Sequence, residues 1–123
     1  MKAKILVLDD EESIRFSFDR FLAAEGYHVS TVASYGAALA SMDATEFDLI
    51  LADIILTDGY GINILKEVMR RTIKTRVIIM TAYPTTETKQ ISFRLNAVDY
   101  LVKPLRQQEL LDAVTRALVN PGK

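Results

Sequence analysis

The sequence predicts an α/β fold, a doubly wound parallel sheet of five strands with helices on both faces. Short apolar or β-rich runs alternate with amphipathic stretches five times along 123 residues, and this alternation is typical of a parallel sheet. Three of these runs are apolar throughout, as are strands that are covered on both faces. Half of the residues are hydrophobic and a quarter are charged, which is the composition of a globular domain.

The first strand and helix are clear. Residues 5–8 form a short apolar run closed by acidic residues, which predicts a buried strand. Apolar side chains then recur at helical spacing over residues 14–22, and Gly26 follows where a helix C-terminus favours glycine. Residues 28–32 are β-rich but mixed in polarity, which indicates an edge strand. They include the single histidine, His28, which we expect at the surface.

The middle of the chain repeats the pattern. Residues 38–42 indicate a second helix, with Ser34 as its N-cap. Residues 49–52 and 77–80 are apolar throughout and predict central strands. Between them, apolar positions over residues 62–69 predict the third helix.

The hydrophobic pattern is less regular in the last part of the chain. Ile91 and Leu95 indicate a fourth helix, and Asn96 replaces glycine as its terminator because asparagine tolerates a left-handed backbone. Residues 100–102 predict the last strand and residues 110–118 the last helix. Right-handed crossovers leave few arrangements, and we expect the strand order 2-1-3-4-5, which places strands 2 and 5 at the edges. That order creates a switch point beside strands 1 and 3, where such folds bind ligands.

The composition excludes several kinds of site. The chain has no cysteine, which excludes disulfides and thiolate chemistry, and one histidine, which excludes a site built from several. Its net charge of −1 does not favour nucleic acid or anionic membranes. No apolar run approaches the roughly 20 residues of a membrane helix, and we expect no signal peptide, because the first residues do not have the pattern of one. We expect a cytoplasmic protein with one domain over residues 1–120 and a tail or linker start over 121–123.

Polar side chains stand at the ends of four of the five expected strands. Asp9 and Asp10 end the first, Asp53 the third, Thr81 the fourth and Lys103 the fifth. Parallel strands end at one edge of the sheet, so these side chains should converge. Two carboxylates about 4 Å apart repel by roughly 4 kcal/mol at an effective dielectric near 20. Oxygen ligands select a hard cation, and beside phosphate this is usually Mg²⁺, with Mn²⁺ as a second candidate.

A carboxylate beside a cation, a lysine and a hydroxyl can act as the nucleophile in phosphoryl transfer. Each residue alone also has a structural alternative: Asp10 could cap the first helix, Thr81 could be structural and Lys103 could be solvated. The combination favours the chemical interpretation. The Lys103–Pro104 peptide bond could be cis, aiming the lysine over the strand ends, or trans at the start of the last helix.

Together these motifs resemble the receiver domains of response regulators in two-component signal transduction. The resemblance rests on Asp9-Asp10, Asp53, Thr81-Ala82 and the run Tyr100 to Pro104, and it covers roughly residues 3–119. It implies a flavodoxin-like fold and a bacterial source for the protein. It also implies a signalling domain rather than an enzyme, because the chain would catalyse phosphoryl transfer only to and from its own aspartate.

The resemblance implies that Asp53 accepts the phosphoryl group from a sensor histidine kinase or a phosphotransfer domain. Asp10, Asp53 and the backbone carbonyl of Ile55 would bind Mg²⁺ directly, and Asp9 would reach it directly or through water. Lys103 would pair with the phosphoryl group.

The remaining implied roles concern the switch. Thr81 would hydrogen-bond a phosphoryl oxygen, and Tyr100 would turn inward as Thr81 moves. The face formed by the fourth helix, fifth strand and fifth helix would change partners and could form a homodimer on phosphorylation. We expect no direct contact of this chain with nucleic acid or membrane.

The loop after Asp53 departs from the family pattern. Leu56-Thr57 replaces the common Met-Pro, which frees the backbone and predicts a more mobile loop, while Gly61 stands at the family's loop glycine. In the family, the residues at the positions of Ile55 and Tyr83 flank the path of the attacking water. Bulky groups there predict slow hydrolysis of the phosphoaspartate.

Two other functions fit parts of the pattern. Phosphatases of the haloacid dehalogenase type also use aspartate, Mg²⁺ and lysine, but they usually carry D-x-D-x-T where residues 9–13 read DDEES. Flavin-binding electron carriers share the predicted fold, but they need a Ser-, Thr- or Gly-rich phosphate loop. The acidic run after the first strand would repel that phosphate.

Overall fold

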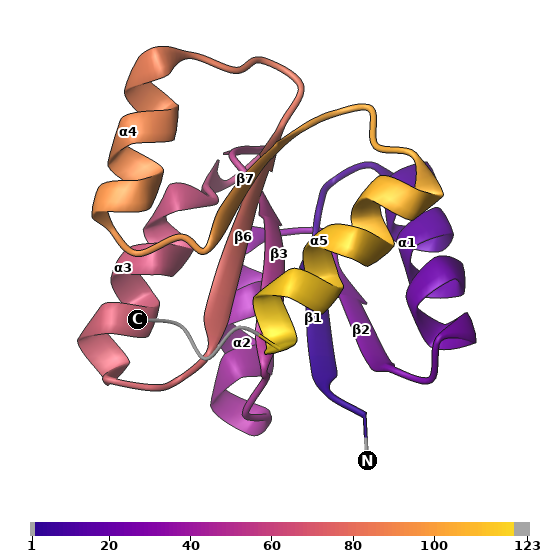
Figure 1. The fold of residues 1–123 in the computed structure, drawn as a ribbon. Coiled ribbons are helices and arrows are strands. Elements are labelled where there is room, and N and C mark those ends of the chain that lie inside the picture. The colour runs from indigo at the N-terminus through magenta and orange to yellow at the C-terminus, as the bar shows by residue number, and fades with distance from the viewer. Residues whose placement is uncertain (1, 120–123) are drawn as a thin grey trace.

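A five-stranded parallel sheet forms the middle layer of a three-layer sandwich in this computed structural model, which describes residues 2–119 (Figure 1). The strand order is β2-β1-β3-β6-β7. The strands are β1 Lys4–Leu8, β2 His28–Val32, β3 Leu49–Asp53, β6 Arg76–Thr81 and β7 Asp99–Val102. Because β6 and β7 are the fourth and fifth strands of the predicted pattern, the expected order 2-1-3-4-5 is confirmed.

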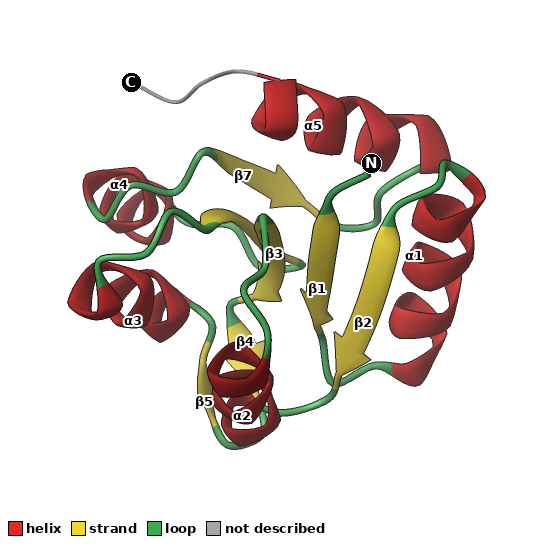
Figure 2. Cartoon of the chain, turned by 90° about the horizontal axis from the view of Figure 1, so that it is seen from below, coloured by secondary structure: helices red, strands yellow, loops and turns green. Residues whose placement is uncertain are grey.

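Helices cover both faces of the sheet (Figure 2). They are α1 Glu12–Ala24, α2 Tyr35–Ala44, α3 Ile62–Arg71, α4 Thr86–Arg94 and α5 Gln107–Val119. Side chains alternate along each strand, so Ile5 and Val7 face α1 and α5, whereas Leu6 and Leu8 face α2 and α3. Each such fully buried side chain contributes about 1.5–3 kcal/mol to folding. The sheet is therefore a stiff support for whatever follows its strands.

The residues predicted to begin or end helices have the conformations expected of them. Gly26 has a φ of +94° and Asn96 a φ of +75°, the left-handed conformations expected of residues that terminate helices. Ser34 accepts a hydrogen bond from the N–H of Ala37, as predicted for an N-cap. His28 lies exposed on the edge strand, as expected.

The segment after Asp53 contains a feature that the sequence did not predict. Strands β4, Ile55–Leu56, and β5, Gly59–Tyr60, form a short antiparallel pair. The Asp58 carboxylate in the turn accepts hydrogen bonds from the N–H groups of Tyr35 and Gly36, at 2.8 and 3.0 Å. A carboxylate at a helix N-terminus is favourable, so this turn is attached to α2.

None of the helices described within residues 2–119 is long and apolar enough to cross a membrane. The predicted tail, residues 121–123, and the predicted domain limit at residue 120 lie outside the described residues.

Candidate functional site

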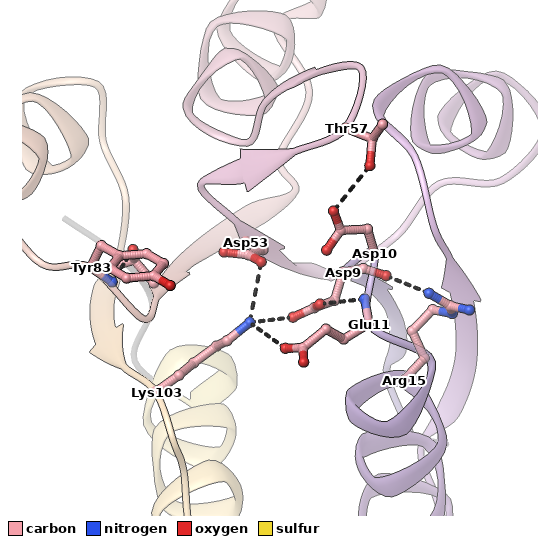
Figure 3. Close-up of polar contacts among 9 residues, drawn as sticks. Asp9, Asp10, Glu11, Arg15, Asp53, Thr57, Tyr83 and Lys103 are labelled. Atoms are coloured by element: carbon pink, nitrogen blue, oxygen red, sulfur yellow. Dashed lines mark hydrogen bonds and ion pairs between the residues drawn. The ribbon is translucent and has the colours of Figure 1, made fainter.

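Two neighbouring strands bring three carboxylates together at the C-terminal edge of the sheet (Figure 3). Asp9 follows β1 directly, and Asp53 is the last residue of β3. One ligand atom each from Asp9, Asp10 and Asp53 lies within 4.8 Å of the others. Asp9 is fully buried and Asp53 is 8% exposed, so water screens their mutual repulsion poorly. The convergence predicted for these three residues is confirmed.

Lys103 is the cation at the centre of this cluster (Figure 3). Its Nζ donates to Oδ2 of Asp9 at 2.8 Å and to Oδ2 of Asp53 at 3.2 Å. Glu11 adds a more distant ion pair at 3.8 Å. The Lys103 side chain is 7% exposed, so the alternative of a solvated lysine is wrong. The Lys103–Pro104 peptide bond is cis.

The pKa shifts of Asp53 and Lys103 reflect their burial and their mutual attraction. Burial raises the pKa of Asp53 and the Asp9 charge raises it further; attraction to Lys103 only partly offsets this. Burial alone would lower the pKa of Lys103, but the hydrogen bonds and charges of Asp9 and Asp53 outweigh burial and raise it. The lysine therefore stays charged, and the negative charge that it leaves uncompensated favours a second cation.

The loop after β1 holds these acids in place. The Asp9 Oδ1 atom accepts from the Glu11 N–H at 2.9 Å, and the Asp9 carbonyl accepts from Arg15 Nη1 at 2.8 Å. Asp10 does not cap α1: Glu11 occupies the N-cap position without a side-chain bond. The exposed Asp10 instead accepts from the Thr57 hydroxyl at 3.2 Å. Sequence reasoning missed these roles of Glu11, Arg15 and Thr57; proximity to the acidic pair was a signal for Glu11 alone.

Thr81 and Tyr100 come from the two neighbouring strands β6 and β7. Thr81 is 1% exposed, its hydroxyl accepts from the Tyr83 N–H at 3.0 Å, and its carbonyl accepts from the Lys103 N–H at 2.8 Å. The Tyr100 hydroxyl lies 2.7 Å from Oγ1 of Thr88 on α4. Thr81 is thus fixed to the strand that leads into Lys103, and Tyr100 contacts the helix expected in the output face.

Gly61 is required by close approach rather than by its backbone angle. A Cβ at this position would lie 1.9 Å from the carbonyl oxygen of Asp53, far inside any van der Waals contact. The Gly61 N–H also donates to the Ile54 carbonyl at 2.8 Å. Ile55 begins β4 and its side chain is 50% exposed. The glycine therefore lets the chain fold back against the residue that carries the central carboxylate.

The donor set fits a hard divalent cation. Three carboxylates provide oxygen ligands, and the described residues contribute neither histidine nor cysteine to this cluster. Such a set suits Mg²⁺ rather than a soft metal. A cation here would offset the repulsion between Asp9 and Asp53, and Lys103 would remain available to a further anion.

Comparison with known proteins assigns the family. Residues 5–115 match the family model described as the response regulator receiver domain. The chain is 34% identical over 119 residues to the transcriptional regulatory protein ZraR of Salmonella typhimurium, which covers 97% of this chain and 27% of ZraR. The chain thus spans about a quarter of the length of this curated relative. We expected no direct contact of this chain with nucleic acid. The comparison does not support that expectation, because ZraR is a transcriptional regulatory protein.

Solved structures agree. Chemotaxis protein CheY4 of Vibrio cholerae superposes with a TM-score of 0.90 at 32% identity, over 96% of this chain and all of that one. TrrA of Thermotoga maritima, solved with Mg²⁺ and beryllofluoride, superposes with a TM-score of 0.84 at 30% identity, over 96% of this chain and 100% of TrrA. The beryllofluoride-activated NtrC4 receiver domain, a dimer, superposes with a TM-score of 0.90 at 28% identity, over 96% of this chain and 98% of that one.

These matches favour the signalling interpretation over the phosphatase and the electron carrier. A family match over most of the chain, the same fold in solved receivers and an acidic cluster at the switch point agree with one another. The chain therefore belongs to the response regulator receiver domains, the phosphoacceptor switches of two-component systems.

Proposed function

We propose that Asp53 is the residue that accepts the phosphoryl group. The observation that carries this proposal is the pairing of its carboxylate with Lys103 at 3.2 Å inside a cluster of acids. Asp53 ends a fully buried strand, so its position is fixed before any donor arrives. Such preorganisation is what phosphoryl transfer demands of a protein.

Mg²⁺ would be held by Asp10, Asp53 and the Ile55 carbonyl, with Asp9 directly or through water; Mn²⁺ could replace it. When bound, the ion supplies positive charge against the phosphoryl oxygens. Asp53 attacks phosphorus through a carboxylate oxygen, and the bond from phosphorus to the donor breaks. Lys103 remains charged and offsets the anion that results. A buried ammonium in a site of low dielectric is worth far more than one in water.

The donor would be a sensor histidine kinase or a phosphotransfer domain, and the only catalysis would be transfer to and hydrolysis from Asp53. The Thr81 hydroxyl would turn to a phosphoryl oxygen. It would give up the hydrogen bond that it now accepts from the Tyr83 N–H at 3.0 Å. Tyr100 would follow, leaving Thr88. We place the domain in the cytoplasm.

Labelling with acetyl phosphate tests the acceptor. The wild-type chain with Mg²⁺ should gain one phosphoryl group, measured by intact mass, and Asp53→Asn should gain none. Asp48→Asn is the matched control, because Asp48 precedes the same strand at its other end; it should label like wild type. Labelling of Asp53→Asn at the wild-type rate would refute the assignment.

Homodimerisation is the output that we favour. Several exposed apolar side chains lie on or beside α4 and β7: Tyr83, Phe93, Val98 and Val102. Activated NtrC4, a relative in structure, is a dimer. Sizing chromatography with and without beryllofluoride should show a shift to dimer, and Phe93→Asp should suppress it. A monomer in both conditions would exclude this output.

A further inference from the structure

The turn between β4 and β5 connects two parts of the molecule. On one side the Thr57 hydroxyl donates to Oδ2 of Asp10 at 3.2 Å (Figure 3). On the other, the Asp58 carboxylate accepts from two N–H groups at the start of α2. These backbone hydrogen bonds hold the pKa of Asp58 below its usual value. The turn therefore has a fixed attachment on the side away from the acids.

Asp10 needs such an attachment more than the other two acids do. Asp9 and Asp53 are both buried and both bound by Lys103. Asp10 is exposed, and within residues 2–119 the Thr57 hydroxyl is the hydrogen-bond partner of its side chain. An exposed carboxylate without a partner samples several rotamers, and ordering it on binding costs free energy.

We propose that Thr57 is a positioning residue for the metal site, and this proposal rests on the function proposed above. Its hydroxyl occupies Oδ2 of Asp10 and leaves Oδ1 free for a cation shared with Asp9 and Asp53. Partners that orient a ligand in this way raise the metal affinity of a site. Proline, which the family commonly has here, has no hydroxyl, so this contact is a property of the present chain's turn.

The rest of the turn supports the geometry that Thr57 needs. Ile55 pairs with Tyr60 and Leu56 with Gly59, which closes the loop immediately around Thr57 and Asp58. A Cβ on Gly59 would lie 3.5 Å from the Tyr35 side chain, so the turn packs against α2 as well as bonding to it. The Thr57 hydroxyl is thereby kept beside Asp10 before any ion binds.

Binding of Mn²⁺ tests the proposal without any phosphoryl transfer. The signal of free Mn²⁺ in electron paramagnetic resonance reports the dissociation constant directly. Thr57→Val should weaken binding about fivefold, which corresponds to the roughly 1 kcal/mol net contribution of a typical hydrogen bond. The dissociation constant of Thr57→Ser, which keeps the hydroxyl, should stay within about twofold of wild type, and that of Thr57→Pro should resemble that of Thr57→Val.

The possible outcomes separate the two proposals. The positioning role would be overturned if Thr57→Val bound Mn²⁺ as tightly as wild type, or if Thr57→Ser bound it as weakly as Thr57→Val. Wild-type protein that fails to bind Mn²⁺ would instead overturn the metal site itself. Urea unfolding of the metal-free variants checks that each variant folds as stably as wild type. If Thr57→Val is less stable, Thr57→Ala against Thr57→Ser gives the same comparison.

Discussion

The two ends of the central strands handle charge in opposite ways. At the N-terminal ends, each polar group described here has a neutral or opposite partner. Asp48 accepts from the Lys4 N–H at 2.8 Å. Arg76 donates to the carbonyls of Ala117 and Leu118 at the end of α5, and Thr75 donates to the Phe47 carbonyl. These contacts hold elements together, and the two charged side chains among them, Asp48 and Arg76, are each bonded to neutral backbone groups instead of being clustered with like charges.

At the C-terminal ends, three clustered carboxylates share Lys103. No buried side-chain nitrogen or oxygen among the described residues lacks a hydrogen-bond partner, so the defect is one of charge and not of bonding. The comparison teaches that hydrogen bonds alone do not offset the repulsion of clustered like charges, whereas a bound cation would. A divalent ion should therefore change the stability loss caused by a substitution at the C-terminal edge, and should leave unchanged the loss caused by one at the N-terminal edge.

Lys103→Met should give the largest effect. It leaves buried Asp9 and Asp53 without their cation, which should lower the free energy of unfolding in EDTA by about 3 kcal/mol. Mg²⁺ should restore part of this loss, because the ion supplies charge at the same place. Urea unfolding with EDTA and with Mg²⁺ measures both. Lys4→Met at the other edge serves as control; an equal loss there would erase the distinction between the edges.

Arg76→Met should be intermediate. Removing the donor to the last carbonyls of α5 should lower the free energy of unfolding by about 1–2 kcal/mol. Here Mg²⁺ should restore nothing beyond its effect on wild type, since Arg76 lies at the opposite edge. The same urea experiment measures the change. Recovery of stability on adding Mg²⁺ would show that the edges are coupled.

Asp53→Asn should have the opposite sign, a gain of about 1 kcal/mol in the free energy of unfolding in EDTA at neutral pH, the usual size of a stabilising substitution. Burial raises the pKa of Asp53 above its ordinary value of 3.8, so the folded state prefers the protonated acid. Wild-type stability relative to the variant should therefore fall as the pH rises above about 3.8 and through the folded pKa. Unfolding at several pH values measures this. A wild-type advantage that grows with pH would contradict the sign.

The smallest effect concerns the lifetime of the phosphoryl group. Ile55, the first residue of β4, and Tyr83, in the loop after β6, are 50% and 73% exposed. Ile55→Asn, which replaces an apolar group by one that can orient water, should speed loss of the phosphoryl group about fivefold. Mass spectrometry over time measures this, with Phe93→Ala as an exposed control. An unchanged rate would show that these side chains do not limit access of water.

Most of the fold could be predicted because buried parallel strands leave a plain signal. The five strands and the left-handed ends at Gly26 and Asn96 follow from local pattern, whereas the strand order follows from crossover handedness and the central position of the apolar strands. The positions of Asp9, Asp53, Thr81 and Lys103 follow from the strands that they end or follow.

The parts that were missed depend on contacts between distant loops. A two-residue strand such as β4 has no periodicity to detect, so the segment was predicted only as a loop. The partners of Thr57 and Asp58 lie 47 and more than 20 residues away, and no local pattern encodes them. The capping alternative for Asp10 failed for the same reason, because its partner comes from another loop.

The burial of β3 has a consequence for how a signal can leave the site. Every residue of β3 from Leu49 to Asp53 is buried, so its amides should rank among the slowest to exchange with deuterium. A carboxylate carried on such a segment stays in place when its chemical state changes. Any rearrangement must therefore arise in the surrounding loops and in α4, and faster or slower exchange there, with β3 unaltered, would trace the route.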